Sequence, residues 1–304
     1  MNPTEEQYAG CFLGLALGDA LGAPFEGGLI ERALWRVIGQ TKDQEARFTD
    51  DTQMALDLAN SLIRNKQLNQ SDLSQAFANS YHWSRGYGPS TARLLKRIRK
   101  GESWEIANKT TYPQGSFGNG AAMRAPIMAL FLPENSRTLT AYTQLSAQVT
   151  HTHSLGIEGA VLIAQATAFL LQHPANPLNL FASLKEHCHT LEFSSGLQIA
   201  EQWLVQDYPT CPKEVAKLLG NGMTAVRSCV TALYCALRFL DSDFLTLLKF
   251  IKSLRGDVDT ISAMAGALWG AYHSLEQLPN SRIEQRVQII QVAQRLYQLH
   301  RKGR

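Results

Sequence analysis

The stretch Gly10-Cys-Phe-Leu-Gly14-Leu-Ala-Leu-Gly18-Asp-Ala-Leu-Gly22 decides the fold. Its four glycines recur at a strict spacing of four, which in a helix places all of them along nearly one face. Each glycine inside a helix costs about 1 kcal/mol relative to alanine, so a row of them needs a compensating cause. We therefore expect a helix that packs very closely against a second helix.

A late segment of the chain offers a matching smooth surface, made by Ala263, Gly266, Ala267 and Gly270. Close packing alone explains both rows of small residues. The alternative is that the two helices approach in order to bring the loops at their ends to a shared site.

Apolar residues recur at helical spacing along most of the rest of the chain, whereas the alternation typical of strands is hard to find. This pattern predicts an all-α protein. The expected helices span about 4–21, 51–64, 71–83, 91–100, 120–130, 139–149, 154–172, 177–189, 197–207, 226–239, 243–253, 260–274 and 282–299.

Length and composition leave one large domain or two, since 304 residues compare with about 150 for a typical domain. A hydrophobic fraction of 45% and a charged fraction of 18% are typical of a globular protein. The net charge of +3 is small and dispersed, so we expect no nucleic-acid partner.

The apolar stretch 159–171 is shorter than the roughly 20 residues that cross a bilayer, so no membrane partner is expected. Glu5 and Glu6, not basic residues, precede the apolar segment 11–23, which argues against a signal peptide. The five cysteines form no Cys-x-x-Cys pair, which indicates neither a disulfide framework nor a thiolate zinc site. These features predict a cytoplasmic protein.

Two acidic clusters each precede a predicted helix: Thr49-Asp50-Asp51-Thr52 and Asp257-Val258-Asp259-Thr260. Capping of the helices explains each cluster taken alone. Capping needs one such residue, however, and each cluster supplies two carboxylates that repel one another unless a cation neutralises them. Hard divalent cations take oxygen ligands of this kind, and converging loops would hold two ions. The absence of a paired His or Cys ligand nearby argues against zinc.

Five blocks in order resemble the ADP-ribosylglycohydrolase family, typified by dinitrogenase reductase-activating glycohydrolase and the ADP-ribosyl-acceptor hydrolases. They cover about residues 9 to 274, and each block alone is weak. The blocks are 14–26, 48–52, 115–124, 150–151 followed by 159–160, and 256–260 followed by 265–267.

The resemblance implies one compact, orthogonal helical domain over 1–304, with two Mg²⁺ or Mn²⁺ ions. It also implies hydrolysis of the glycosidic bond between ADP-ribose and a modified protein side chain or small acceptor. Asp259 is expected to bridge the ions. The ligands carried over are Thr49, Asp50, Asp51, Asp257, Asp259 and Thr260.

Glu26 stands where relatives have an acidic residue over the metals, and we expect it to act as an acid/base or a gating carboxylate. Asp51 is the competing base. The alternative for Glu26 is an exposed acidic residue of a loop, without a catalytic role. Cleavage of a ribosyl bond passes through an oxocarbenium-like state that a carboxylate and an activated water assist.

The glycine-rich segment 115–120 opens a predicted helix, where backbone N–H groups would suit a diphosphate; an ordinary turn is the alternative. The family context makes Ser116, Gly118, Asn119 and Gly120 candidate ADP-ribose contacts. Phe117 either stacks on adenine or belongs to the core. His151 is expected near the ligand and His153 less so, although a lone histidine is more often structural.

Residues 83–91 are expected at the rim of the cleft. Arg255 departs from the small residue of many relatives, and could pair with Asp257, contact a phosphate or face solvent. A different class of function also stays open: a catalytically silent ADP-ribose-binding protein or a structural, crystallin-like protein of this fold. The predicted ligands come from both ends of the chain without a linker between them, which favours one domain.

Overall fold

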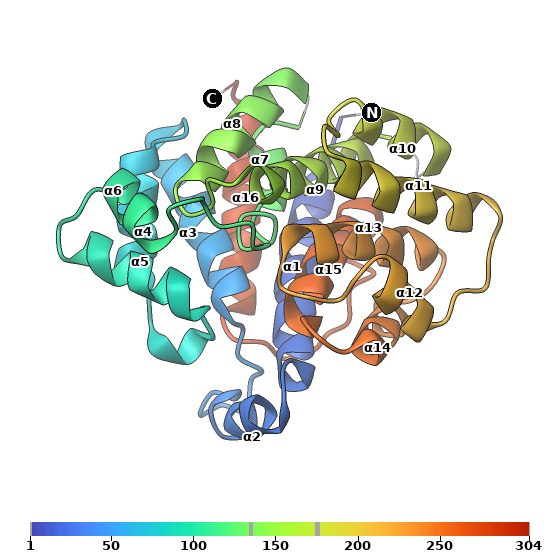
Figure 1. The fold of residues 1–304 in the computed structure, drawn as a ribbon, viewed down its shortest axis with the longest axis horizontal. Coiled ribbons are helices and arrows are strands. Elements are labelled where there is room, and N and C mark those ends of the chain that lie inside the picture. Colours follow the sequence, from blue (N-terminus) through green and yellow to red (C-terminus); the bar gives the residue numbers. More distant parts are fainter. Residues whose placement is uncertain (1, 134–135, 174–176, 304) are drawn as a thin grey trace.

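The computed structural model describes residues 2–133, 136–173 and 177–303. These residues form sixteen α-helices and three short 3-10 helices, and no strand occurs among them (Figure 1). The predicted all-α class is therefore confirmed.

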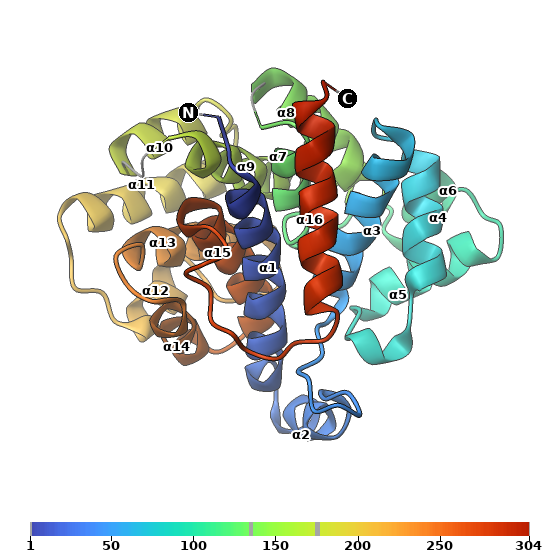
Figure 2. The ribbon, with the colours of Figure 1, turned by 180° about the vertical axis from the view of Figure 1, so that it is seen from behind.

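The centre of the fold is α1 (Glu5–Gly22), packed along α15 (Val258–His273), with α16 (Arg286–Arg301) on its other side (Figure 2). A Cβ on Gly14 would overlap the carbonyl oxygen of Gly266, and a Cβ on Gly270 would overlap that of Gly10. The two backbones thus touch directly. This close approach confirms the packing partner predicted from the row of glycines.

The same packing reaches the acidic segments. A Cβ on Gly22, at the end of α1, would lie only 2.8 Å from the Cα of Asp259 at the start of α15. The chain then continues through η1 (Ala23–Phe25) to Glu26. The small-residue rows therefore agree with both interpretations: they allow close packing, and the packed helices bring their end loops together.

The remaining helices surround this centre (Figure 1). One side carries α3 (Asp50–Asn65), α4 (Gln70–Ser80), α5 (Pro89–Arg99) and α6 (Trp104–Thr111). The other side carries α10 (Pro177–Lys185), α11 (Leu191–Val205), α12 (Pro212–Leu218), α13 (Cys229–Arg238) and α14 (Phe244–Leu254). Helices α7 (Pro126–Phe131), α8 (Ser136–Gln148) and α9 (Ser154–Gln172) lie near the two termini, and α2 (Leu29–Ile38) lies at the opposite end.

Several predicted elements differ from those observed. Helix α9 has the predicted bounds, whereas α2, α6 and α12 were not predicted. The helix expected over 226–239 is divided into η3 (Ala225–Arg227) and α13. The helix expected over 120–130 begins only at Pro126, because tight turns precede it: the N–H groups of Ala122 and Met123 both bond the carbonyl of Asn119. Proline suits the first turn of a helix, where its missing N–H costs nothing.

Two segments, Glu5–Phe25 and Ser154–Gln172, have the length and hydropathy of a membrane span, contrary to the expectation from the longest uncharged stretch. Their apolar windows are 83% and 78% buried inside the fold. Helices in the core of a globular protein have this character, since they face other helices on all sides.

Candidate active site

The two acidic clusters meet, as predicted. Each lies at the start of a central helix, α3 or α15, and Thr260 Oγ1 lies 3.4 Å from Asp51 Oδ1 across the junction. The capping explanation holds for Thr49, whose hydroxyl accepts a hydrogen bond from the N–H of Asp51 at 3.3 Å. It does not hold for Asp257, which occupies the N-cap position of α15 but makes no capping hydrogen bond with its side chain.

Carboxylate oxygens converge at this junction. One carboxylate oxygen from each of Glu26, Asp257 and Asp259 lies within 4.8 Å of the others. Asp257 and Asp259 are buried and Glu26 is half-buried. Oδ2 of Asp51 is buried without a hydrogen-bond partner among the described residues. A buried oxygen without a partner normally needs an explanation, and a bound cation provides one.

Burial raises the pKa values of Asp50, Asp51 and Asp259 well above the usual range, and neighbouring carboxylates raise them further. The charged groups that raise these three pKa values are the neighbouring carboxylates, including Asp19 and Glu26. Such a cluster is costly to ionise unless positive charge enters it. Its all-oxygen donor set fits a hard divalent cation.

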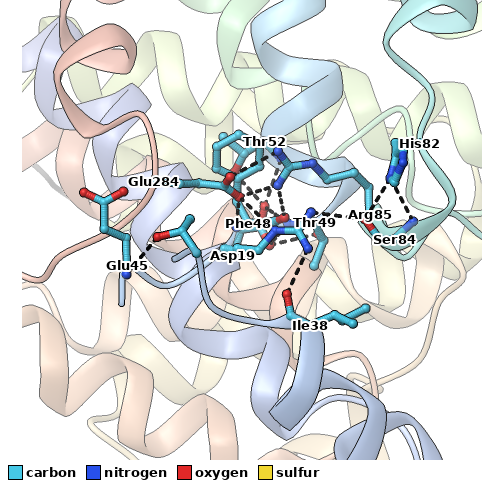
Figure 3. Close-up of polar contacts among 12 residues, drawn as sticks. Asp19, Ile38, Glu45, Phe48, Thr49, Thr52, His82, Ser84, Arg85 and Glu284 are labelled. Atoms are coloured by element: carbon cyan, nitrogen blue, oxygen red, sulfur yellow. Dashed lines mark hydrogen bonds and ion pairs between the residues drawn. The ribbon is translucent and has the colours of Figure 1, made fainter. Parts of the chain in front are cut away.

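Asp19 supports the first acidic segment from beneath (Figure 3). Its carboxylate accepts hydrogen bonds from the hydroxyl groups of Thr49 at 2.8 Å and of Thr52 at 2.6 Å, and from both backbone N–H groups at about 3.0 Å. Asp19 is fully buried, and burial raises its pKa although these bonds oppose the shift. Because Thr49 donates its hydroxyl proton to Asp19 and accepts from the N–H of Asp51, one lone pair of its oxygen remains for a ligand.

A second buried contact fixes the residue before the acidic pair (Figure 3). Glu284 accepts a hydrogen bond from the N–H of Phe48 at 2.9 Å, and Arg85 donates to the Phe48 carbonyl at 2.7 Å. Arg85 also pairs with Glu284 and lies 4.1 Å from the centre of the Phe48 ring. Both polar backbone groups of Phe48 are therefore held by side chains distant in the sequence.

The glycine-rich segment forms the opposite wall, but its N–H groups do not begin a helix as expected. The N–H of Asn119 bonds the carbonyl of Met223 at 3.0 Å, and the N–H of Ala225 bonds the carbonyl of Phe117 at 3.0 Å. Residues 223–225 thus hold the segment in place. Met223 and Thr224 also line the cavity, and no pattern in the sequence had identified them.

The cavity between these walls has a volume of about 290 Å³. Every site residue predicted from the sequence lines it except Thr49, which lies behind the surface with 2% exposure. Of the expected rim 83–91, residues 88–91 line the cavity. Tyr112 and Met123, which were not predicted, also do so.

The aromatic and histidine candidates separate in the structure. Phe117 is 51% exposed and lines the cavity, so it does not belong to the core. His151 is buried at the cavity wall. His153 instead caps α9 by accepting from the N–H of Leu155 at 3.2 Å, and it lies edge-on to Phe117. Arg255 is exposed.

Comparison with known proteins identifies close similarity over nearly the whole chain. A family profile of ADP-ribosylglycohydrolases matches residues 1–304. The chain is 34% identical to ADP-ribosylhydrolase ARH3 of Bos taurus, over 90% of this chain and 87% of that protein. It is 26% identical to the ADP-ribosyl-(dinitrogen reductase) glycohydrolase of Rhodospirillum rubrum, over 93% and 92% of the two chains.

A solved structure described as an ADP-ribosylglycohydrolase-related protein complex has the same fold. It superposes with a TM-score of 0.67 at 26% identity, over 97% of this chain and 98% of the other.

Proposed function

Because this chain belongs to the ADP-ribosylglycohydrolase family, we propose that it hydrolyses the glycosidic bond between ADP-ribose and a modified protein side chain or a small acceptor. The proposal includes two Mg²⁺ or Mn²⁺ ions. The observation that carries it is the buried carboxylate cluster, in which Oδ2 of Asp51 has no hydrogen-bond partner among the described residues and burial together with like charges raises the pKa values of Asp50, Asp51 and Asp259.

Side-chain oxygens from both acidic segments would hold the ions. Their chemistry supports this, since carboxylate and hydroxyl oxygens are the ligands that Mg²⁺ and Mn²⁺ prefer. Bound ions of this kind lower the pKa of water and orient ribose hydroxyls. Asp259 would bridge the two ions. The proposed ligands are Thr49, Asp50, Asp51, Asp257, Asp259 and Thr260.

Glu26 is the proposed acid/base or gating carboxylate. It belongs to the cluster with Asp257 and Asp259, and its half-exposed side chain is accessible from the cavity. A general acid or base has to reach the proton that it transfers. Asp51 is the competing base, and its buried position makes it the better candidate ligand.

The other wall would bind the ADP-ribosyl group. Polar and glycine residues of segment 115–120 offer short side chains and close backbone approach to a diphosphate. Phe117 is the candidate for stacking on adenine, because its ring is exposed at the cavity. The proposed substrate contacts are Ser116, Phe117, Gly118, Asn119, Gly120 and His151.

The alternative is an ADP-ribose-binding or structural protein of the same fold. A structural protein has no need of four convergent carboxylates, and the repulsion among them would only destabilise it. We also propose a single domain over 1–304, a cytoplasmic location, and no nucleic-acid or membrane partner. All five cysteines are free, as is usual in a reducing compartment.

The test compares peptides carrying mono-ADP-ribosylated arginine or serine, with Mg²⁺, with Mn²⁺ and after chelation. We expect metal-dependent release of ADP-ribose, which Asp259→Ala abolishes. Asp243→Ala, at the distant cap of α14, is the matched control and should retain release. Binding of ADP-ribose without release under any metal condition would overturn hydrolysis in favour of a binding role.

A further inference from the structure

The two ring nitrogens of His151 face different surroundings. Nδ1 lies 2.8 Å from the hydroxyl oxygen of Thr150, in the buried interior. Nε2 lies beside the glycine-rich segment, because a Cβ placed on Gly118 or Gly120 would be 3.3 or 3.2 Å from it. His151 therefore has one nitrogen committed to the protein and one directed toward the cavity that it lines.

The partner of Nδ1 is itself constrained by Arg124. This buried guanidinium donates to Thr150 Oγ1 at 2.9 Å, to the carbonyl of Gly120 at 2.5 Å and to that of Ser146 at 3.2 Å. Arginine has N–H donors and no acceptor, so Thr150 Oγ1 must accept in this contact. The hydroxyl proton of Thr150 is then available to His151 Nδ1.

The reverse direction of the Thr150–His151 hydrogen bond would leave one polar group without a partner. If Nδ1 carried the proton, Thr150 Oγ1 would accept from both neighbours, and its own hydrogen would need another acceptor. Within the described part of the chain, the contacts of this oxygen are those with Arg124 and His151. A buried hydroxyl hydrogen without an acceptor is unfavourable, so Nδ1 is better placed as an acceptor.

The ring also carries a single proton. Burial lowers the pKa of His151 to about 3, and the nearby positive charge of Arg124 contributes in the same direction. At neutral pH the imidazole is uncharged, and its one proton belongs to whichever nitrogen does not accept from Thr150.

We propose that Arg124 and Thr150 hold His151 as the neutral Nε2–H tautomer, which presents an uncharged N–H donor to oxygen atoms of the bound ligand. Arg124 and Thr150 are positioning residues, since they act through His151. The same guanidinium holds the carbonyl of Gly120, so the donor and the glycine-rich wall are oriented by one side chain. Only the identity of the ligand, the diphosphate or a ribose of ADP-ribose, rests on the proposed function.

The first experiment reads the tautomer directly and needs no ligand. The full-length protein, labelled with ¹⁵N in its eight histidines, is examined by long-range proton–nitrogen correlation at pH 7. His151→Asn identifies the signals by their loss. We expect a protonated Nε2 and an unprotonated Nδ1; a protonated Nδ1, or a doubly protonated ring, would overturn the proposal.

A second experiment tests the role of Thr150, which is a cleaner position than Arg124 because Arg124 also lies 4.8 Å above the Phe77 ring. Thr150→Val removes the hydroxyl at similar size, and Thr150→Ser retains it. We expect Thr150→Val to lose the single-tautomer signature and to weaken ADP-ribose binding about tenfold, the effect of one hydrogen bond. Thr150→Ser should restore both.

The outcomes separate this inference from the proposed hydrolysis. An unchanged tautomer signature in Thr150→Val, with the fold intact by circular dichroism, would overturn the role of Thr150. An Nε2–H signature in a protein that releases no ADP-ribose would count against hydrolysis and leave the tautomer assignment standing.

Discussion

The side-chain amide of Asn119 donates a hydrogen bond to Oδ2 of Asp257 at 2.5 Å, which joins the glycine-rich wall of the cavity to the second acidic segment. The same nitrogen lies 3.0 Å from the hydroxyl oxygen of Ser228. Burial raises the pKa of Asp257, and the bond from Asn119 opposes that shift. The wall proposed to bind substrate and the cluster proposed to bind ions are therefore coupled through one amide.

Asn119→Ala should consequently affect both functions. A carboxylate that has lost its orienting donor binds a metal less well, and such changes typically cost 10- to 100-fold in affinity. We expect weakening of this order in the Mn²⁺ concentration that half-saturates release, together with weaker ADP-ribose binding by calorimetry. Asn65→Ala, whose amide bonds Ser61 and Asp72 away from the cavity, is the control. Unchanged Mn²⁺ dependence in Asn119→Ala would contradict the coupling.

The local sequence was sufficient to predict the helical class, the close helix pair and the two acidic segments, because glycine spacing and paired carboxylates are visible within short segments. The roles of Glu26, His151 and segment 115–120 were expected from the resemblance to the family, and four residues of the cavity lining were not predicted: Tyr112, Met123, Met223 and Thr224. The local sequence was not sufficient to predict the side chains that hold the first acidic segment in place. Glu284 and Arg85 hold Phe48 from 236 and 37 residues away, and no local pattern marks them. Asp19 belongs to a recognised block, yet its role depends on its position beneath Thr49, which only the folded chain defines.

Asp19→Asn should destabilise the protein and weaken its ion binding. The carboxylate accepts hydrogen bonds from four donors of Thr49 and Thr52, whereas an amide presents one oxygen and places an NH₂ against donors. Hydrogen bonds to charged groups contribute about 1.5 to 3 kcal/mol each, so we expect the free energy of unfolding to fall by about 3 kcal/mol. Urea unfolding and Mn²⁺ titration measure the two effects.

Asp243→Asn is a matched control for that substitution. Asp243 also accepts from the N–H and the hydroxyl of one threonine, Thr246, at 2.9 and 2.8 Å, but at the exposed cap of α14. Asparagine caps helices about as well as aspartate, so the change should be within about 1 kcal/mol. Equal effects of the two substitutions would show that Asp19 is no more than a helix cap.

Gly14→Ala should destabilise the fold although alanine is the better helix former. Its Cβ would overlap the carbonyl oxygen of Gly266, so α1 and α15 would have to separate. Overpacking of this kind costs about 1 to 3 kcal/mol, measured as a lower free energy of unfolding. Gly88→Ala meets no atom within 4 Å and should leave that free energy nearly unchanged. A stabilised Gly14→Ala variant would refute direct backbone contact.

The α1–α15 separation also predicts a functional effect of Gly14→Ala. Gly22 and Asp259 lie at the end of the same interface, so the displacement should reach the carboxylate cluster. We expect weaker Mn²⁺ binding in Gly14→Ala than in wild type at a temperature where both are folded. Equal Mn²⁺ affinities would confine the effect of Gly14 to stability.

Asp57 provides a pH-dependent prediction away from the proposed ligands. Its partly buried carboxyl group accepts from Ser80 Oγ at 2.5 Å and from Gln53 Nε2 at 3.2 Å. Burial raises its pKa to about 7, although these bonds and the charge of Arg64 act in the opposite direction. The folded protein therefore binds this proton more tightly than the unfolded chain, whose aspartates have pKa values near 3.9.

The stability that this proton contributes is complete below about pH 4 and is lost as the pH rises through about 7. Asp57→Asn cannot titrate, so its free energy of unfolding should rise relative to wild type between pH 4 and pH 8, by roughly 2 to 4 kcal/mol. The carboxylate cluster titrates in both proteins and cancels in the difference.

Asp72→Asn provides a contrast: hydrogen bonds from Ser61 and Arg64 lower the pKa of Asp72 in spite of burial, so the contribution of Asp72 is complete above about pH 4 and is lost only as the pH falls below that value. Urea unfolding between pH 4 and pH 8 should show a rising difference from wild type for Asp57→Asn and a nearly flat one for Asp72→Asn; a flat profile for Asp57→Asn would contradict the raised pKa.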